Sequence, residues 1–75
     1  MFSNMASVPL PDAKRYRPEP AYLRKLYEVS RLTQLECAVR LGVEERTFMY
    51  WLSGERRFPY SAQFCMEALA KRKAR

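Results

Sequence analysis

The chain has 75 residues, a formal net charge of +6 at pH 7 and a sequence pI near 9.8. This length supports one compact domain, because so short a chain buries only about 60% of the surface that its unfolded form exposes. The stability margin is then thin, and a second subunit that covers apolar surface would widen it. The positive charge favours a polyanionic partner, either nucleic acid or an anionic membrane surface.

Metal sites, cofactor sites and catalytic centres are not indicated. The chain has no histidine, and its two cysteines, Cys37 and Cys65, are far apart in the sequence. No set of metal ligands and no nucleophile–base arrangement can be assembled from the other residues. The first ten residues lack a basic start and a continuous apolar run, which argues against a secretory signal and a membrane span. We expect a cytoplasmic protein with free thiols and no small-molecule ligand.

The positive charge is concentrated at the two ends of the chain. Residues 1–17 carry a net charge of +2 and residues 71–75 a net charge of +4. Between Pro18 and Ala70, seven basic residues balance seven acidic ones. The ends therefore supply bulk attraction to a polyanion, and any sequence specificity has to come from the placement of side chains within the domain.

The first half of the chain is predicted to form an extended arm followed by a helix. Four of the five prolines lie in the first 20 residues, which predicts an extended arm over residues 1–17, ahead of a domain over 18–71 and a basic tail over 72–75. Apolar residues at three- and four-residue spacing predict a helix from about Glu19 to Arg31, with Pro20 in its first turn.

The second half contains three further helix patterns. Thr33 and Glu36 form a capping-box pattern that starts a short helix, which ends before Gly42. The next helix, with apolar residues at helical spacing, is expected over Val43 to Ser53 and stops at Gly54. A polar, basic loop over residues 54–58 precedes a last helix over 60–71, with Pro59 in its first turn. No strand pattern is present, so we predict an all-α bundle of four to five helices.

The segment from Gln34 to Gly54 carries the most specific pattern. Two short helices joined by a few residues need a small residue on the first helix and a turn residue that tolerates a left-handed backbone. Ala38 and Gly42 fit these two roles. The wedge between the helices would be filled by Val43, Phe48, Trp51, Cys37 and Leu41.

This segment resembles the helix-turn-helix of the lambda-repressor and Cro-like family. That motif begins with Gln, has Ala four residues on and Gly eight residues on, and ends with a bulky aliphatic residue and a Trp. Each type is present here, with Phe48 in place of the usual branched aliphatic. An ordinary helical hairpin with a coincidental Ala and Gly is the alternative.

A second resemblance extends over nearly the whole chain. The runs PDA near Pro11, PEPAYLRKL, RTFMYWLSG and PYSAQFCMEALA are similar to the anti-CRISPR-associated repressors of phages and mobile elements. Those small proteins shut down the promoter of their own anti-CRISPR operon. The resemblance implies an autoregulatory, homodimeric repressor in a bacterial cytoplasm that binds double-stranded DNA at an inverted-repeat operator.

The residues opposite Phe48 and Trp51 on the expected recognition helix would enter the major groove. Arg46 is the strongest candidate, since a bidentate arginine–guanine contact contributes roughly 1–3 kcal/mol of discrimination. A solvated Arg46 paired with an acidic neighbour is the alternative. The aromatic and thioether side chains on this face could instead extend the core. The candidate base-contact residues are Glu45, Arg46, Met49 and Tyr50.

Contacts to the DNA backbone are expected on both sides of this helix. Gln34 and the first N–H groups of its helix would bind phosphate oxygens, and the basic loop ahead of Tyr60 resembles the family's phosphate-contacting segment. A merely solvated loop is the alternative, and Thr47 could instead bond to the preceding turn. The candidate backbone-contact residues are Thr33, Gln34, Thr47, Arg56, Arg57 and Tyr60.

Two features depart from the family. Related repressors carry basic residues directly after the glutamine, whereas this chain has Leu35 and Glu36. Glu44 and Glu45 would oppose phosphates unless they cap the helix or accept a hydrogen bond from cytosine. The operator is therefore expected to differ from those of the relatives.

The last helix predicts a homodimer. Its apolar residues spread around more of the circumference than one buried stripe requires, so one side can pack on the first helix and another on a second subunit. A two-fold axis would set the recognition helices about 34 Å apart. One broad buried face in a monomer is the alternative. The candidate dimer-interface residues are Phe64, Met66, Ala68 and Leu69.

Three other function classes compete with a repressor. The acidic residues on the expected reading face are compatible with a protein-interaction module, such as an antitoxin or an anti-CRISPR inhibitor. The basic ends are compatible with a non-specific nucleic-acid binder. An enzyme is the third class, and no residue pattern supports it.

Overall fold

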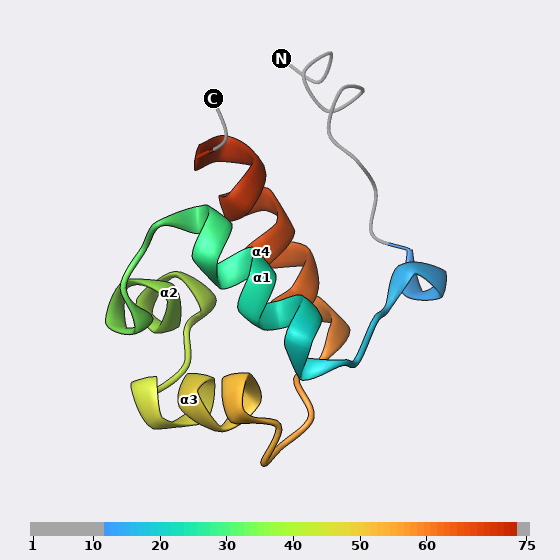
Figure 1. Ribbon diagram of the computed structural model, residues 1–75, viewed down its shortest axis with the longest axis horizontal. Coiled ribbons are helices and arrows are strands. Elements are labelled where there is room, and N and C mark those ends of the chain that lie inside the picture. The colour runs from blue at the N-terminus through green and yellow to red at the C-terminus, as the bar shows by residue number, and fades with distance from the viewer. Residues whose placement is uncertain (1–11, 74–75) are drawn as a thin grey trace.

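A computed structural model describes residues 12–73, with side chains described as far as Lys71. Within this range the chain forms one 3-10 turn and four α-helices, and no strand (Figure 1). The all-α fold predicted from the sequence is confirmed. The elements are η2 (Ala13–Arg15), α1 (Pro20–Ser30), α2 (Gln34–Leu41), α3 (Glu45–Ser53) and α4 (Tyr60–Lys73).

Two pairs of helices make up the bundle. The most extensive packing is between α1 and α4, which lie against each other through the middle of the molecule (Figure 1). The shorter α2 and α3 pack on each other, and α3 also packs on α1. The hydrophobic core therefore lies where all four helices meet.

Apolar side chains from all four helices and from the loop before α4 fill this core. Phe48 and Leu23 are fully buried and Phe58 is 1% exposed, and each contributes roughly 1.5–3 kcal/mol by leaving water. The ring of Phe48 meets those of Tyr27 and Trp51 edge-on, at centroid distances of 5.7 and 6.5 Å, an arrangement that aromatic pairs prefer. The core consists of Leu23, Cys37, Ala38, Phe48, Trp51, Leu52, Phe58, Ala62 and Met66.

The helices begin and end close to the residues predicted from the sequence, with small differences at some of the ends. Pro20 begins α1 as predicted, and α1 ends at Ser30 because Arg31 takes a left-handed backbone with φ 62°. The helix expected from Val43 begins only at Glu45, because Glu44 has an extended backbone at the N-cap. The last helix extends past Lys71 to Lys73, into the expected tail. Residues 74–75 lie outside the described range.

The prediction of an extended arm is wrong for residues 12–17. Residues 13–15 form η2, which Asp12 caps by accepting a hydrogen bond from the Lys14 N–H. Tyr16 packs edge-on against Phe58 at 5.9 Å and donates its hydroxyl proton to the Phe58 carbonyl. This segment is therefore part of the folded domain. The rest of the predicted arm, residues 1–11, lies outside the described residues.

Gln63 of α4 is the main anchor of this segment. Its side chain is fully buried; its Oε1 accepts the Arg17 N–H at 2.7 Å, and its Nε2 donates to the Arg15 carbonyl at 2.8 Å and to Glu67 Oε2 at 3.2 Å. A buried amide is tolerated only when its polar atoms are paired in this way.

No helix in residues 12–73 is both long enough and apolar enough to cross a membrane.

Candidate nucleic-acid interface

Three residues, 42–44, connect α2 to α3. Gly42 takes a left-handed backbone with φ 75°, and its N–H donates to the Val39 carbonyl at 3.2 Å. The N–H of Val43 donates to the carbonyl of Ala38 at 3.0 Å, so two free carbonyls at the end of α2 are paired. A Cβ added to Gly42 would meet no atom within 4 Å. Backbone conformation, not space, therefore requires glycine here.

The two faces of α3 differ as the sequence predicts. Phe48, Trp51 and Leu52 are buried, with Ala38 of α2 only 1% exposed beneath them in the same core. Gly42 takes the left-handed backbone that the sequence predicts, Ala38 is buried, and the predicted wedge residues lie in the core or against it, with Leu41 and Val43 half-buried at its edge.

The outward face of α3 carries the candidate base-contact residues. Glu45, Arg46 and Met49 are exposed, and the exposed fraction of Met49 is 48%. Among the described side chains, Arg46 has no acidic partner within ion-pair distance, so the alternative pairing with Glu45 is not formed. The guanidinium of Arg46 is thus available to a ligand. Tyr50 is half-buried at the edge of this face.

Tyr50 is held by the loop that follows α3. The guanidinium of Arg56 lies over its ring, with Cζ 4.7 Å from the ring centre, and the Arg56 N–H donates to the Tyr50 carbonyl at 3.2 Å. Ser53 donates its hydroxyl proton to the same carbonyl at 3.1 Å. The loop therefore folds back onto α3, and Arg56 and Arg57 remain exposed on it.

The end of this loop corrects the expectation of a wholly polar segment. Phe58 is 1% exposed and belongs to the core, so it anchors the loop between α3 and α4. Tyr60 is half-buried, and its hydroxyl accepts the Asp12 N–H at 2.7 Å. No described residue accepts the hydroxyl proton of Tyr60, so it can be donated to a ligand.

The start of α2 holds the capping box that the sequence predicts. The Glu36 N–H donates to Thr33 Oγ1 at 3.1 Å, and the Thr33 N–H donates to Glu36 Oε1 at 2.9 Å. The capping box therefore occupies the side chains of Thr33 and of Glu36, one of the acidic residues by which this chain differs from the family. Glu44 occupies the N-cap of α3 but makes no capping hydrogen bond through its side chain. Thr47 is half-buried in the next turn.

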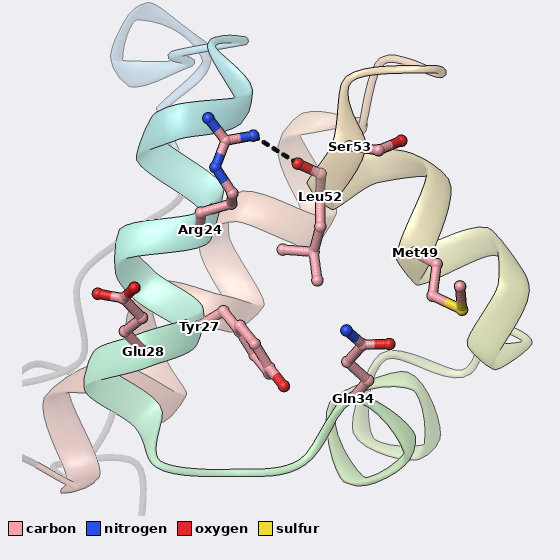
Figure 2. Close-up of a pocket in the computed structure, with 7 residues that line it drawn as sticks. All are labelled: Arg24, Tyr27, Glu28, Gln34, Met49, Leu52 and Ser53. Atoms are coloured by element: carbon pink, nitrogen blue, oxygen red, sulfur yellow. Dashed lines mark hydrogen bonds between the residues drawn. The ribbon is translucent and has the colours of Figure 1, made fainter.

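A groove separates α1 from α2 and α3 on this side of the molecule (Figure 2). Gln34 of α2 and Met49 of α3 lie near each other on the side opposite α1, and Arg24 reaches from α1 to the end of α3, where its Nη1 donates to the Leu52 carbonyl at 2.7 Å. The groove has a volume of about 410 Å³. No sequence pattern identifies Arg24 as a site residue, because only the folding of α1 against α3 brings it here. The lining residues are Arg24, Tyr27, Glu28, Gln34, Met49, Leu52 and Ser53.

The predicted dimer interface is wrong for one residue. Met66 is fully buried in the core of its own chain, so it cannot contact a second subunit. Its place on the inner face of α4 could not be distinguished from sequence spacing alone. Phe64 and Leu69 are half-buried, Leu69 packs against the core and Ala68 is exposed. These three residues keep some surface for a partner.

Two ionisable groups outside α3 have pKa values that are shifted from their ordinary values. Burial raises the pKa of the Cys37 thiol, and burial together with the hydrogen bond to Glu67 raises the pKa of the Tyr22 hydroxyl. Both groups belong to the packing of the bundle and neither faces α3's outer surface. Within the described part of the chain, no three metal-ligating side chains gather.

Comparison of the chain with models of known protein families and with curated protein sequences gave no match.

Proposed function

We propose that this protein is a sequence-specific DNA-binding repressor that acts as a homodimer, with α2 and α3 as its helix-turn-helix. The observation that carries the proposal is the division of α3 into two faces. Phe48 and Trp51 fix the helix to the core, and Arg46 and Met49 project from the opposite side. A helix held in this way can enter the major groove without disturbing the fold.

Base recognition rests on the exposed face of α3. Arg46 suits a bidentate contact to guanine, worth roughly 1–3 kcal/mol of discrimination. Glu45 can accept a hydrogen bond from the cytosine amino group, and Met49 can contact a thymine methyl. Tyr50 supports Arg56 through its ring and is the fourth candidate on this face.

Backbone contacts then fix the orientation of the helix on the duplex. Arg56 and Arg57 supply exposed guanidinium groups directly after α3, and their planar donors match phosphate oxygens. Gln34 lies at the first position of α2, on the same side as Met49 (Figure 2). Thr33, Thr47 and Tyr60 complete the set of proposed backbone contacts.

Repression would follow from occupancy alone. A dimer on an inverted repeat sets two recognition helices about 34 Å apart and excludes polymerase from the promoter without a cofactor. The dimer is proposed to use Phe64, Ala68 and Leu69. The resemblance of the sequence to anti-CRISPR-associated repressors points to the promoter of an anti-CRISPR operon as the target.

One observation favours a second candidate function. Leu35 and Val39 lie four residues apart on α2 and are 56% and 69% exposed, so they form an apolar strip on one side of that helix. Such a strip suits a protein surface better than DNA. A protein-interaction module, such as an antitoxin or an anti-CRISPR inhibitor, would use this face.

Selection from random duplexes tests the proposal. The full chain is incubated with a pool of random double-stranded DNA, the bound fraction is sequenced over several rounds, and the enriched duplex is compared with its scrambled version in a gel shift. We expect an inverted repeat to be enriched and to bind at least about 10³-fold tighter than the scrambled duplex. Equal binding to both duplexes indicates a non-specific binder, and no binding favours the protein-interaction module.

A further inference from the structure

One cationic side chain, that of Arg24, lines the groove beside α3 but is not among the proposed base-contact or backbone-contact residues. Arg24 is exposed on α1 and lines this groove together with Gln34 and Met49, both of which belong to the proposed interface. Figure 2 shows Arg24 reaching over the groove toward the C-terminal end of α3. A strand of DNA that passes Gln34 and Met49 therefore comes within reach of α1.

The guanidinium of Arg24 is fixed in position. Its Nη1 donates to the Leu52 carbonyl at 2.7 Å, in the last turn of α3, where backbone carbonyls lack helical partners and a cation is favoured. Arginine has five N–H donors, so the remaining donors are free for an anion. An arginine held at one edge loses less side-chain entropy on binding than a mobile one.

We propose that Arg24 binds a phosphate oxygen of the DNA backbone and that α1 thereby becomes part of the interface. This inference rests on the proposed function. The chemistry of the groove suits one sugar–phosphate strand: Arg24 and Gln34 supply donors to phosphate, and Tyr27, Met49 and Leu52 supply an apolar wall for the sugars. The carbonyl of Leu52 holds the guanidinium without neutralising its charge.

Glu28 limits where along the groove the DNA strand can lie. It lies one turn beyond Arg24 on α1, at the rim of the groove, and its carboxylate points away from Gln34 and Met49 (Figure 2). A phosphate beside Glu28 would be repelled. The strand is therefore placed at the Arg24 end of the groove, near Leu52 and Ser53.

A salt titration of DNA binding tests the assignment, with Lys25 as the matched control. Lys25 is the next residue on α1, is exposed and carries the same charge, but it does not line the groove. Affinities of the full-length wild type, Arg24→Gln and Lys25→Gln are measured for the selected duplex at several salt concentrations. A lost phosphate contact lowers the slope of log K against log salt by about 0.9.

The expected result is a fall of about tenfold in affinity for Arg24→Gln, with the slope lowered by about 0.9 and the ratio of selected to scrambled binding unchanged. Lys25→Gln should change the affinity much less. Equal effects of the two substitutions overturn the inference. A wild type that does not distinguish the duplexes overturns the proposed function instead.

Glu28→Gln provides a readout that does not depend on the hydrogen bond to Leu52. Removing this carboxylate should raise the affinity for both duplexes by about two- to threefold, as expected for an exposed charge. Unchanged or weaker binding contradicts the placement of the strand. Arg24→Gln is also compared with Arg24→Lys in the salt titration, because Arg24→Lys keeps the charge, and thermal melting checks that both variants fold. A slope that is lowered in Arg24→Gln but retained in Arg24→Lys supports a phosphate contact, and a slope that is retained in both excludes it.

Discussion

The guanidinium of Arg56 lies 4.7 Å from the centre of the Tyr50 ring, and the backbone N–H of Arg56 donates to the carbonyl of Tyr50. The loop after α3 is therefore attached to the helix whose outer face we propose as the reading surface. A cation over an aromatic ring at an exposed site contributes about 0.5–1 kcal/mol. The two side chains should act as one unit, although sequence patterns alone place Tyr50 among the base contacts and Arg56 among the backbone contacts.

Non-additivity is the first prediction. In urea unfolding followed by the fluorescence of the single tryptophan, Tyr50→Ala and Arg56→Ala should destabilise the protein by less together than the sum of their separate effects, with a coupling of about 0.5–1 kcal/mol. Tyr50→Ala and Arg57→Ala serve as the control pair and should be additive. Additive behaviour of the first pair would mean that the stacking has no energetic value in solution.

Two glycines end helices in the left-handed region, and their substitution should differ in cost. Gly42→Ala places a Cβ in open space, so only the backbone strain of about 1–2 kcal/mol is expected. At Gly54, with φ 88°, a Cβ would also lie 3.0 Å from Cγ of Pro20. Chemical denaturation should therefore show a larger loss for Gly54→Ala than for Gly42→Ala. The reverse order would contradict the contact between α1 and the end of α3.

Gln63 should control the attachment of residues 12–17. Gln63→Ala leaves the Arg17 N–H and the Arg15 carbonyl without their partner, at a cost of about 1–3 kcal/mol. Hydrogen exchange at the Arg17 amide should accelerate strongly, while the amides of α3 keep their relative protection. Ser61→Ala, at an exposed position on the same helix, is the control. An unchanged exchange rate at Arg17 would refute the anchoring role.

Stability should fall in alkaline solution through Tyr22. Burial raises the pKa of its hydroxyl above its ordinary value of 10.0, and the hydrogen bond to Glu67 acts in the same direction. The folded state thus retains the proton more strongly than the unfolded state, so this contribution is complete below pH 10 and is lost as the pH rises through the raised value. The difference in free energy of unfolding between wild type and Tyr22→Phe should shrink as the pH rises from neutral through the raised pKa of Tyr22. A constant difference would show that Tyr22 does not titrate in this way.

The local features of the fold could be predicted from the sequence. The capping box at Thr33, the glycines that end α2 and α3, and the buried and exposed faces of α3 depend on residues close together in the chain. Capping and helical periodicity act over three to four residues, so their patterns can be recognised without coordinates. For the same reason Arg46 could be assigned to the outer face.

The errors concern contacts between distant parts of the chain. Residues 12–17 pack on α4 through Gln63, which is 46 and 48 positions away from its partners Arg17 and Arg15. A proline-rich stretch has no helical period from which this packing could be inferred. Met66 was misassigned because α4 has apolar residues around much of its circumference, and only the contact with α1 determines its inner face. Arg24 was missed because its place in the groove depends on the same folding.

The exposure of Arg46 on the outer face of α3 leads to the most direct test of the account. Binding of wild type, Arg46→Ala and Arg40→Ala to the selected duplex and to single-base variants of it is measured, with circular dichroism as a check of folding. Arg40 is an exposed arginine on α2 and serves as the control. We expect Arg46→Ala to stay folded and to lose about 1–3 kcal/mol of discrimination at one base pair of each half-site, while Arg40→Ala keeps it. A folded Arg46→Ala that discriminates as well as wild type would contradict the assignment of α3 as the recognition helix.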